Sequence, residues 1–217
     1  MLAKEALAEQ RGVSILIFIV VAIVEGVSAL FGRVPFIGAL PVLAISIVSV
    51  VLNVGICELF IKIYYREKTQ IGELLSGLSI NFVRKLGGMF WMGLWVSLWS
   101  MLLIVPGVIK SLAYSMTPYI LADCPDVTAT EALKLSMRMT KGHKGELFVL
   151  ALSWIGWGLL IPLTLGILGI IYVIPYYSLT MAGYYVELRD LAVDSGCISP
   201  KELGLAFDAD NGPVREM

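Results

Sequence analysis

Long apolar runs separated by short polar segments dominate the chain. A helix that crosses a bilayer needs roughly 20 mostly apolar residues, and the first two runs each fit one helix. Two later runs, at 86–122 and 147–186, are too long for one helix and contain proline and glycine near the middle, which favour a break. We divide them at Pro106-Gly107 and after Pro162. The pattern predicts six spans near residues 13–31, 36–63, 86–105, 106–122, 147–161 and 165–186.

These spans predict an all-α fold, because backbone polar groups in lipid must be satisfied within a helix or a closed barrel. Residues 1–190 are predicted to form a polytopic transmembrane helical bundle of three hairpins with amphipathic cytoplasmic connectors. The tail, residues 191–217, is acidic with glycine and proline, and we expect it to be disordered. Lys4 and Arg11 before the first run also suit a signal peptide, but Glu25 and the later spans favour an uncleaved helix.

Lysine and arginine are distributed unevenly between the two sides of this bundle. All of them except Arg33 and Lys110 fall at the termini or in the connections that follow the second and fourth spans. Cytoplasmic segments carry an excess of these residues. We therefore predict that both termini lie in the cytoplasm.

Composition supports a membrane protein. Of 217 residues, 58% are hydrophobic and 15% are charged, against about 45–50% and about 25% in soluble domains. This excludes a disordered protein, a nucleic-acid binder and an ordinary cytosolic enzyme. Three scattered cysteines and a single histidine form no metal-ligand cluster and no disulfide framework. We expect no catalytic residue, no metal and no cofactor.

An internal repeat is suggested by polar segments that begin at Glu5, Glu73 and Glu131, each followed by a hairpin. The second and third units align at an offset of about 57–59 residues, and all units point the same way, as in a parallel repeat. Chance similarity between apolar hairpins is the alternative. The matched positions are Trp95 with Trp154, Trp99 with Trp157, Tyr114 with Tyr172, and Pro118-Tyr119 with Pro175-Tyr176.

Two connectors have the pattern of amphipathic helices. Thr128 and Glu131 fit a capping box, and Lys134, Arg138 and Lys141 then form a basic face opposite an apolar side. The earlier connector has an apolar stripe between Ile71 and Phe82. Both are interpreted as helices at the membrane interface with basic groups toward the headgroups. They either bind anionic lipid or serve as plain connectors.

Charged residues inside spans are candidates for function. Glu25 and Lys110 lie at similar depths below the outer surface, about 9 Å and about 6 Å at 1.5 Å per residue, and have opposite charges. They suggest a pair at a polar site open to the outside, or else a simple packing pair or two separate snorkelling groups. Glu58 and Lys62 suit a surface pair near the cytoplasmic end.

Prolines and hydroxyl groups recur in the fourth and sixth spans. A proline frees a backbone carbonyl, and hydroxyls can satisfy it or bond across helices. One hypothesis is a cavity for an amphipathic ligand, and the alternative is ordinary packing with an aromatic belt. The candidate ligand-binding residues are Glu25, Lys110, Tyr114, Pro118, Tyr172 and Tyr176.

The stretch from Lys110 to Asp123, the following segment from Cys124 to Ser136, and Leu152 to Trp157 together resemble an uncharacterised bacterial multipass family, domain of unknown function 975. The opening Ala3–Leu7 is also similar, although Glu9-Gln-Arg-Gly stands where the family often has Gly-Asn. The resemblance extends to about Glu187. It implies a bacterial membrane protein of about six helices, and it implies no reaction or ligand.

Two classes of function follow from these patterns. The first is a non-enzymatic protein of the bacterial cytoplasmic membrane that binds or transports a lipid or another amphipathic molecule. The second is an accessory subunit that docks a protein partner, or a second copy of itself, through its basic cytoplasmic connectors. Membrane lipids are expected partners in both, and nucleic acid in neither.

Overall fold

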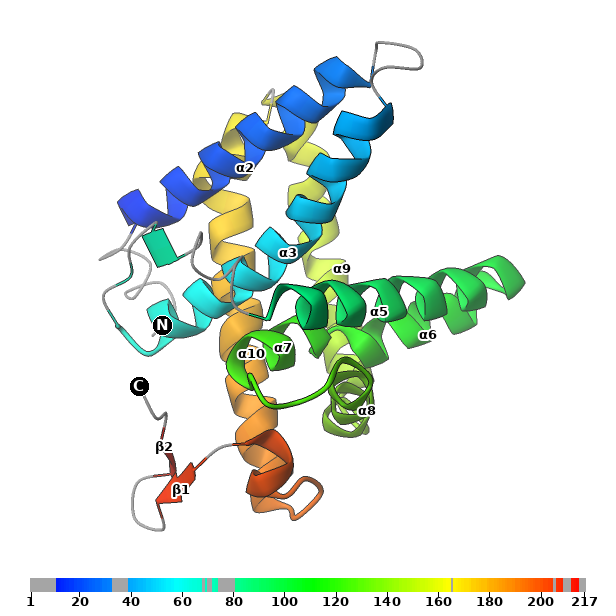
Figure 1. The fold of residues 1–217 in the computed structure, drawn as a ribbon, viewed down its shortest axis with the longest axis vertical. Helices are drawn as coiled ribbons and strands as arrows, with labels where there is room; N and C mark the ends of the chain where they lie inside the picture. Colours follow the sequence, from blue (N-terminus) through cyan, green and yellow to red (C-terminus); the bar gives the residue numbers. More distant parts are fainter. Residues whose placement is uncertain are drawn as a thin grey trace. The chain divides into compact units, whose positions relative to one another are not determined.

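The computed structural model describes residues 11–32, 39–67, 69, 72–73, 81–164, 166–204, 206–208 and 212–214, and most of these are helical (Figure 1). The prediction of an all-α fold is confirmed. The helices are α2 (Arg11–Phe31), α3 (Ala39–Tyr64), α5 (Phe82–Leu102), α6 (Ile104–Tyr114), α7 (Thr117–Asp123), α8 (Ala129–Met139), α9 (Lys144–Leu163), the π-helix η1 (Gly169–Val173), α10 (Ile174–Asp194) and the 3-10 helix η2 (Pro200–Leu203). Two short strands follow, β1 (Ala206–Asp208) and β2 (Gly212–Val214), which pair antiparallel.

The chain divides into two compact units. Unit 1 comprises Met1–Phe82 and Ala151–Gly183, and unit 2 comprises Val83–Leu150 and Tyr184–Met217. Helices α9 and α10 each contribute residues to both. The predicted segment at Glu5 and most of the stripe between Ile71 and Leu78 lie outside the described residues.

In unit 1, α2 and α3 form a helical hairpin (Figure 1). The rings of Phe18 and Phe60 lie 5.8 Å apart between the two helices. The buried residues of α3 are concentrated in its second half, from Val51 to Ile63, whereas Leu40 and Leu43 near its start are exposed. Helix α3 is apolar on all sides, which is typical of a helix in a core or a membrane.

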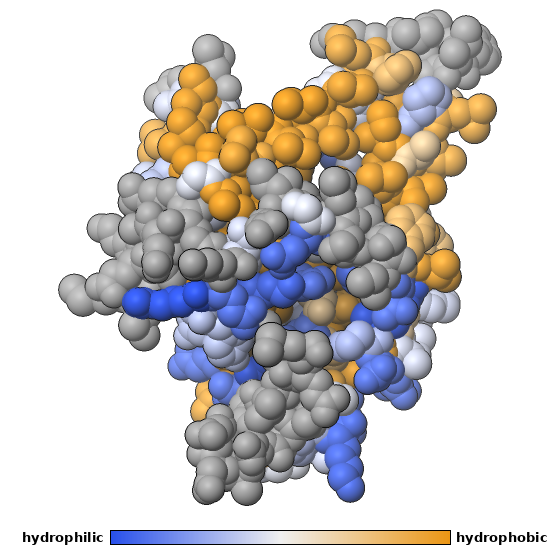
Figure 2. Space-filling view, turned by 60° about the vertical axis from the view of Figure 1, so that its left-hand side comes forward, coloured by the Kyte–Doolittle hydropathy of each residue, from blue (hydrophilic) through white to orange (hydrophobic). Residues whose placement is uncertain are grey.

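Three helices of the described part are long and apolar enough to cross a membrane. They are Gly12–Phe31, Ala39–Tyr64 and Lys144–Pro162, and they contain the predicted spans 13–31, 147–161 and most of 36–63. In the same order, only 17%, 33% and 6% of an 18-residue apolar stretch of each helix is buried. Figure 2 shows a broad hydrophobic area across the upper part of the face that is drawn. Exposed apolar surface of this extent indicates contact with lipid or with another protein.

The other three predicted spans are not single long apolar helices. Helix α5 covers 86–105 almost completely, but glycine, serine and tryptophan make it less apolar than α2 or α3. Its break from α6 falls at Leu103, which is extended, and not at Pro106-Gly107. Pro106 instead lies in the first turn of α6. Backbone N–H groups in a first turn have no intrahelical acceptor, so the missing N–H of proline costs no hydrogen bond there. At Gly107 a Cβ would lie 2.3 Å from Ser100 Oγ, so the tight turn requires glycine.

The prediction of one continuous helix over 106–122 is wrong. This stretch is divided into α6, with 11 residues, and α7, with 7 residues. These lengths correspond to about 17 Å and about 11 Å, well short of the roughly 30 Å of a bilayer core. Pro118 is the reason, because it occupies the first turn of α7 and starts that helix. It therefore lies at the start of a new helix and not inside a continuous one.

The last hairpin turns where the sequence predicts. Pro162 lies in the final turn of α9, and Gly166 follows with a φ of +84°. The chain is helical again from Ile167, and the π-helix η1 directly precedes Pro175 of α10. Within η1 the N–H of Ile174 donates to Gly169 O, five residues back. The wider turn accommodates Pro175, which cannot donate a bond to the preceding turn.

In unit 2, α8 packs against α6 and α7. Its apolar face, which includes Leu133, Leu135 and Met139, is buried, and Ser136 Oγ donates to Ala113 O at 2.8 Å. This differs from the interpretation of α8 as a helix that rests its apolar side on lipid. Protein covers that side, so α8 presents its basic face.

The segment after Asp190 contains ordered structure where the sequence suggests disorder. Within the described residues, α10 continues to Asp194, and η2 and the two strands follow. Ile198 and Leu203 are buried, which anchors the start of this segment in unit 2.

Candidate functional site

Five aromatic side chains of unit 1 form a continuous cluster between α9 and the helical run η1–α10. The rings of Tyr172 and Tyr176 stack at 5.9 Å with an interplanar angle of 5°. Trp157 lies 6.0 Å from Tyr172, and Trp154 lies 5.6 Å from Tyr176 and 5.3 Å from Tyr177. Two of the predicted ligand-binding residues therefore lie together, and we call these five residues the aromatic cluster.

The aromatic cluster combines an open side with an unsatisfied donor. Trp157 is 42% exposed, Tyr172 38% and Tyr177 37%. Trp154 Nε1 is buried, and the described residues offer it no hydrogen-bond acceptor. Buried polar groups in native proteins are nearly always paired, so this N–H is a donor for which a ligand oxygen is a suitable partner.

A related arrangement occurs in unit 2 around Lys110 and Tyr114. Lys110 Nζ lies 5.5 Å from the ring centroid of Trp99 and 5.6 Å from that of Tyr114. Both distances suit cation–π attraction. Lys110 is therefore held by aromatic rings of its own unit.

The other two predicted residues are not members of these clusters. Glu25 is exposed on α2 of unit 1, and Pro118 begins α7 in unit 2. Because Glu25 and Lys110 lie in different units, their pairing stays a prediction. The expected pair of Glu58 and Lys62 is present, with Nζ and Oε1 3.5 Å apart, and Glu73 approaches the same ammonium at 2.8 Å.

A buried ion pair in unit 2 was not predicted from the sequence. Arg189 Nη1 lies 2.9 Å from Asp123 Oδ2, and both side chains are only 2% exposed. Tyr185 donates to the same carboxylate oxygen at 3.0 Å, and Asp190 accepts from Arg189 Nη2 at 2.9 Å. The pair ties the end of α7 to α10. No local spacing reveals it, because its partners are 66 residues apart.

Arg84 supports the same region from α5. Its guanidinium donates to the carbonyls of Leu121 at 2.6 Å and of Cys124 at 2.9 Å, and also to Val127 O. The carbonyl of Leu121 belongs to the last turn of α7, where carbonyls lack an intrahelical partner.

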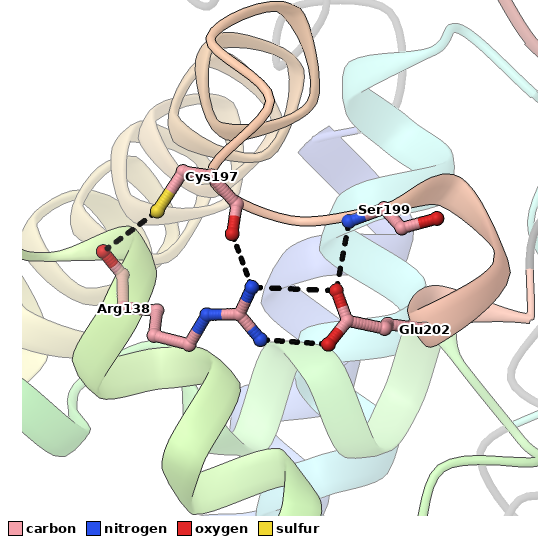
Figure 3. A network of polar contacts seen from close by, with 4 residues as sticks. All are labelled: Arg138, Cys197, Ser199 and Glu202. Carbon is pink, nitrogen blue, oxygen red and sulfur yellow. Dashed lines mark hydrogen bonds and ion pairs between the residues drawn. The ribbon is translucent and has the colours of Figure 1, made fainter.

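The basic face of α8 meets the C-terminal segment (Figure 3). Arg138 Nη1 lies 2.7 Å from Glu202 Oε1, and Arg138 Nη2 donates to Cys197 O. Ser199 N donates to Glu202 Oε2 at 2.8 Å. The hydrogen bond from Arg138 lowers the pKa of Glu202, and that of Arg138 is raised in turn. Lys134 and Lys141, the other members of the predicted basic face, are exposed.

The local prediction at the start of α8 can be compared with this geometry. The capping box of α8 is confirmed, since Thr128 N donates to Glu131 Oε2 at 3.1 Å and Glu131 N donates to Thr128 Oγ1 at 3.4 Å. Within the described residues, no group of three histidine, cysteine, aspartate or glutamate side chains could hold a metal ion.

Residues 101–192 match the family described as "Protein of unknown function (DUF975)". This confirms the predicted resemblance over the stretch that contains the Lys110–Asp123 motif, the capping box and the aromatic cluster. The match begins at residue 101, so the opening motif lies outside it. No curated protein and no solved structure matches the chain.

Proposed function

We propose that this protein is a multipass protein of the bacterial cytoplasmic membrane that binds or transports a lipid or another amphipathic molecule without chemical catalysis. Three apolar, exposed helices support membrane insertion. We propose that α5, the α6–α7 pair and the run from Ile167 to Val186 supply three further crossings. Breaks such as Ser115-Met116 are tolerated in a membrane where protein covers them. The positive-inside distribution of lysine and arginine supports a cytoplasmic location for both termini.

The aromatic cluster is the observation that carries the binding proposal. Its stacked tyrosines offer flat apolar surface, and Trp154 Nε1 is a donor with no partner in the described chain. A molecule with an acyl chain and a carbonyl oxygen satisfies both features. A purely apolar ligand leaves the donor unpaired, which costs about 1–3 kcal/mol.

Native mass spectrometry of the detergent-purified chain tests this proposal. With a bacterial lipid extract, we expect bound lipid on the natural protein and about tenfold weaker retention after Trp157→Ala, since an aromatic contact contributes about 0.5–1.5 kcal/mol beyond its area. Trp91→Ala is the matched control, because Trp91 is a similarly exposed tryptophan (40%) on α5 outside the aromatic cluster. Equal retention by all three proteins would show that this cluster is not the binding site.

A second candidate function is docking of a protein partner through α8. The supporting observation is that the apolar face of α8 is buried while Lys134 and Lys141 are exposed. A photoreactive residue at position 141 should then give one defined protein adduct in cells, whereas the same residue at Thr164 should give none.

A further inference from the structure

A pocket of about 300 Å³ lies within unit 2 between α8, the loop before it and η2. This volume is at the lower end of the range for small-molecule sites. The lining residues of the pocket belong to unit 2, whereas the aromatic cluster belongs to unit 1. Its charged lining residues are Asp126, Glu131, Lys134, Arg138, Lys201 and Glu202.

Three of these side chains already have partners. Glu202 accepts from Arg138 and from Ser199 N. Glu131 accepts from the backbone and the hydroxyl of Thr128, the latter at 2.6 Å. These contacts fix the walls of the pocket, because they hold η2 against α8 and fix the start of α8.

The other three charges are available to a ligand. No hydrogen bond or close ion pair of the described chain involves Lys134, Lys201 or Asp126, although Glu131 lies near Lys134 and Arg84 lies near Asp126. Asp126 also lies beside Gly204. The six charged groups sum to zero formal charge. A ligand that keeps this balance brings both a negative group for the lysines and a positive group for Asp126.

We propose that this pocket binds a zwitterionic phosphate ester, with its phosphate at Lys134 and Lys201 and its ammonium at Asp126. Lysine binds phosphate as a point charge, and a pocket of this volume accommodates a group the size of phosphoethanolamine. A lipid headgroup and a free phosphoester present the same chemistry. The site is independent of the aromatic cluster.

Calorimetry on the full chain in detergent tests the proposal, with glycerophosphoethanolamine as the probe, because its phosphate diester and its ammonium carry balanced charges at neutral pH. We expect saturable binding that weakens about tenfold in Lys201→Gln and in Asp126→Asn, because each substitution removes one charged contact. Lys144→Gln is the matched control, a lysine outside the pocket. Inorganic phosphate should bind more weakly than the zwitterion, and Asp126→Asn should not reduce its affinity.

A second titration distinguishes the sources of the ligand. Displacement by short-chain phosphatidylethanolamine identifies a lipid headgroup, and failure to displace identifies a soluble phosphoester. Lys201→Arg should restore binding if Lys201→Gln fails through loss of charge. Absence of binding to the natural chain, or equal affinities in Lys201→Gln, Asp126→Asn and Lys144→Gln, would overturn the proposal. Neither result changes lipid retention at the aromatic cluster, so the two proposals fail separately.

Discussion

Arg189 is a fully buried arginine, one of the largest such side chains in the described part of the chain. Its charge is balanced by Asp123 and Asp190, and Tyr185 satisfies a further lone pair of Asp123. Removal of one partner of such a pair leaves an uncompensated buried charge. The stability of unit 2 should therefore depend strongly on both partners.

We expect Asp123→Asn to destabilise the protein by about 3–5 kcal/mol. The double variant Asp123→Asn/Arg189→Met should lose less, because it leaves no unpaired charge in the interior. Thermal unfolding in detergent measures both. His143→Gln, which removes one partner of the exposed pair with Glu146 at 3.3 Å, serves as the control and should have almost no effect. A double variant less stable than Asp123→Asn would contradict this account.

Cys124 and Cys197 should differ in reactivity. Burial raises the pKa of the Cys124 thiol to about 12, so at pH 7 to 9 it remains protonated, and the thiolate is the reactive form. Cys197 is exposed. Mass spectrometry after treatment with N-ethylmaleimide at pH 8 should show Cys197 modified and Cys124 unmodified until the protein is denatured. Rapid modification of Cys124 in the folded protein would show that unit 2 opens there.

At the scale of single residues, sequence patterns identify contacts between residues close in the chain and miss contacts between distant ones. The capping box of Thr128 and Glu131 could be predicted, because a spacing of three residues defines it. The pair of Tyr172 and Tyr176 follows from helical spacing for the same reason. The contacts of Arg189 with Asp123 and of Arg84 with the end of α7 depend on tertiary packing, and they join residues that no periodicity relates.

At the scale of elements, proline position explains both the successes and the errors. The pattern of apolar residues finds α2, α3 and α9 with boundaries accurate to within a few residues. It does not distinguish a proline that kinks a helix from one that starts a helix. Pro118 starts α7, whereas Pro175 follows a π-turn inside a continuous helical run. The difference lies in how the preceding residues satisfy their carbonyls.

The contact between Arg138 and Glu202 should hold η2 on α8. Arg138→Gln removes this half-exposed pair. It should increase the population in which the C-terminal segment is open about fivefold, equivalent to about 1 kcal/mol. Limited trypsin digestion at Lys201 measures the opening, and Lys144→Gln is the control. Unchanged cleavage in Arg138→Gln would mean that the apolar contacts of Ile198 and Leu203 alone retain the segment.

The same contact predicts a pH dependence. The pKa of Glu202 is lower in the folded protein than in the unfolded chain, so the pair contributes fully above the ordinary glutamate value of about 4.3 and is lost as the pH falls through the lowered pKa. Hydrogen exchange of residues 200–203, corrected for intrinsic rates, should be constant from pH 8 to pH 5 and rise below pH 4. A rise already between pH 8 and pH 6 would exclude Glu202 as the cause.

At the scale of the whole molecule, most of the exposed surface of α2, α3 and α9 is apolar. The sequence alone predicts this, because hydropathy depends on composition and not on tertiary contacts. The number of crossings is harder to predict, since the apolar stretches around Pro118 and Pro175 fold into interrupted helices. The aromatic cluster was predicted only in part, because the two tryptophans on α9 were identified by the repeat and not as ligand-binding residues.

Cysteine labelling in intact cells measures the proposed orientation. A membrane-impermeant maleimide should label Thr164→Cys at the tip of the last hairpin, and it should reach Cys197 only after the cells are permeabilised. Cys197→Ser in the Thr164→Cys background identifies each signal. Labelling of Cys197 from outside intact cells would indicate the opposite orientation and contradict the positive-inside assignment.

The break at Leu103 is a single residue, and the turn after α9 returns to helix by Ile167. With the proposed orientation, these two tips expose almost no polypeptide to the medium outside the cell. Antibodies and secreted proteases would find few epitopes or cleavable bonds there. Soluble extracellular proteins would have little surface to recognise at these tips, so communication with this part of the protein would run through the lipid phase or from the cytoplasm.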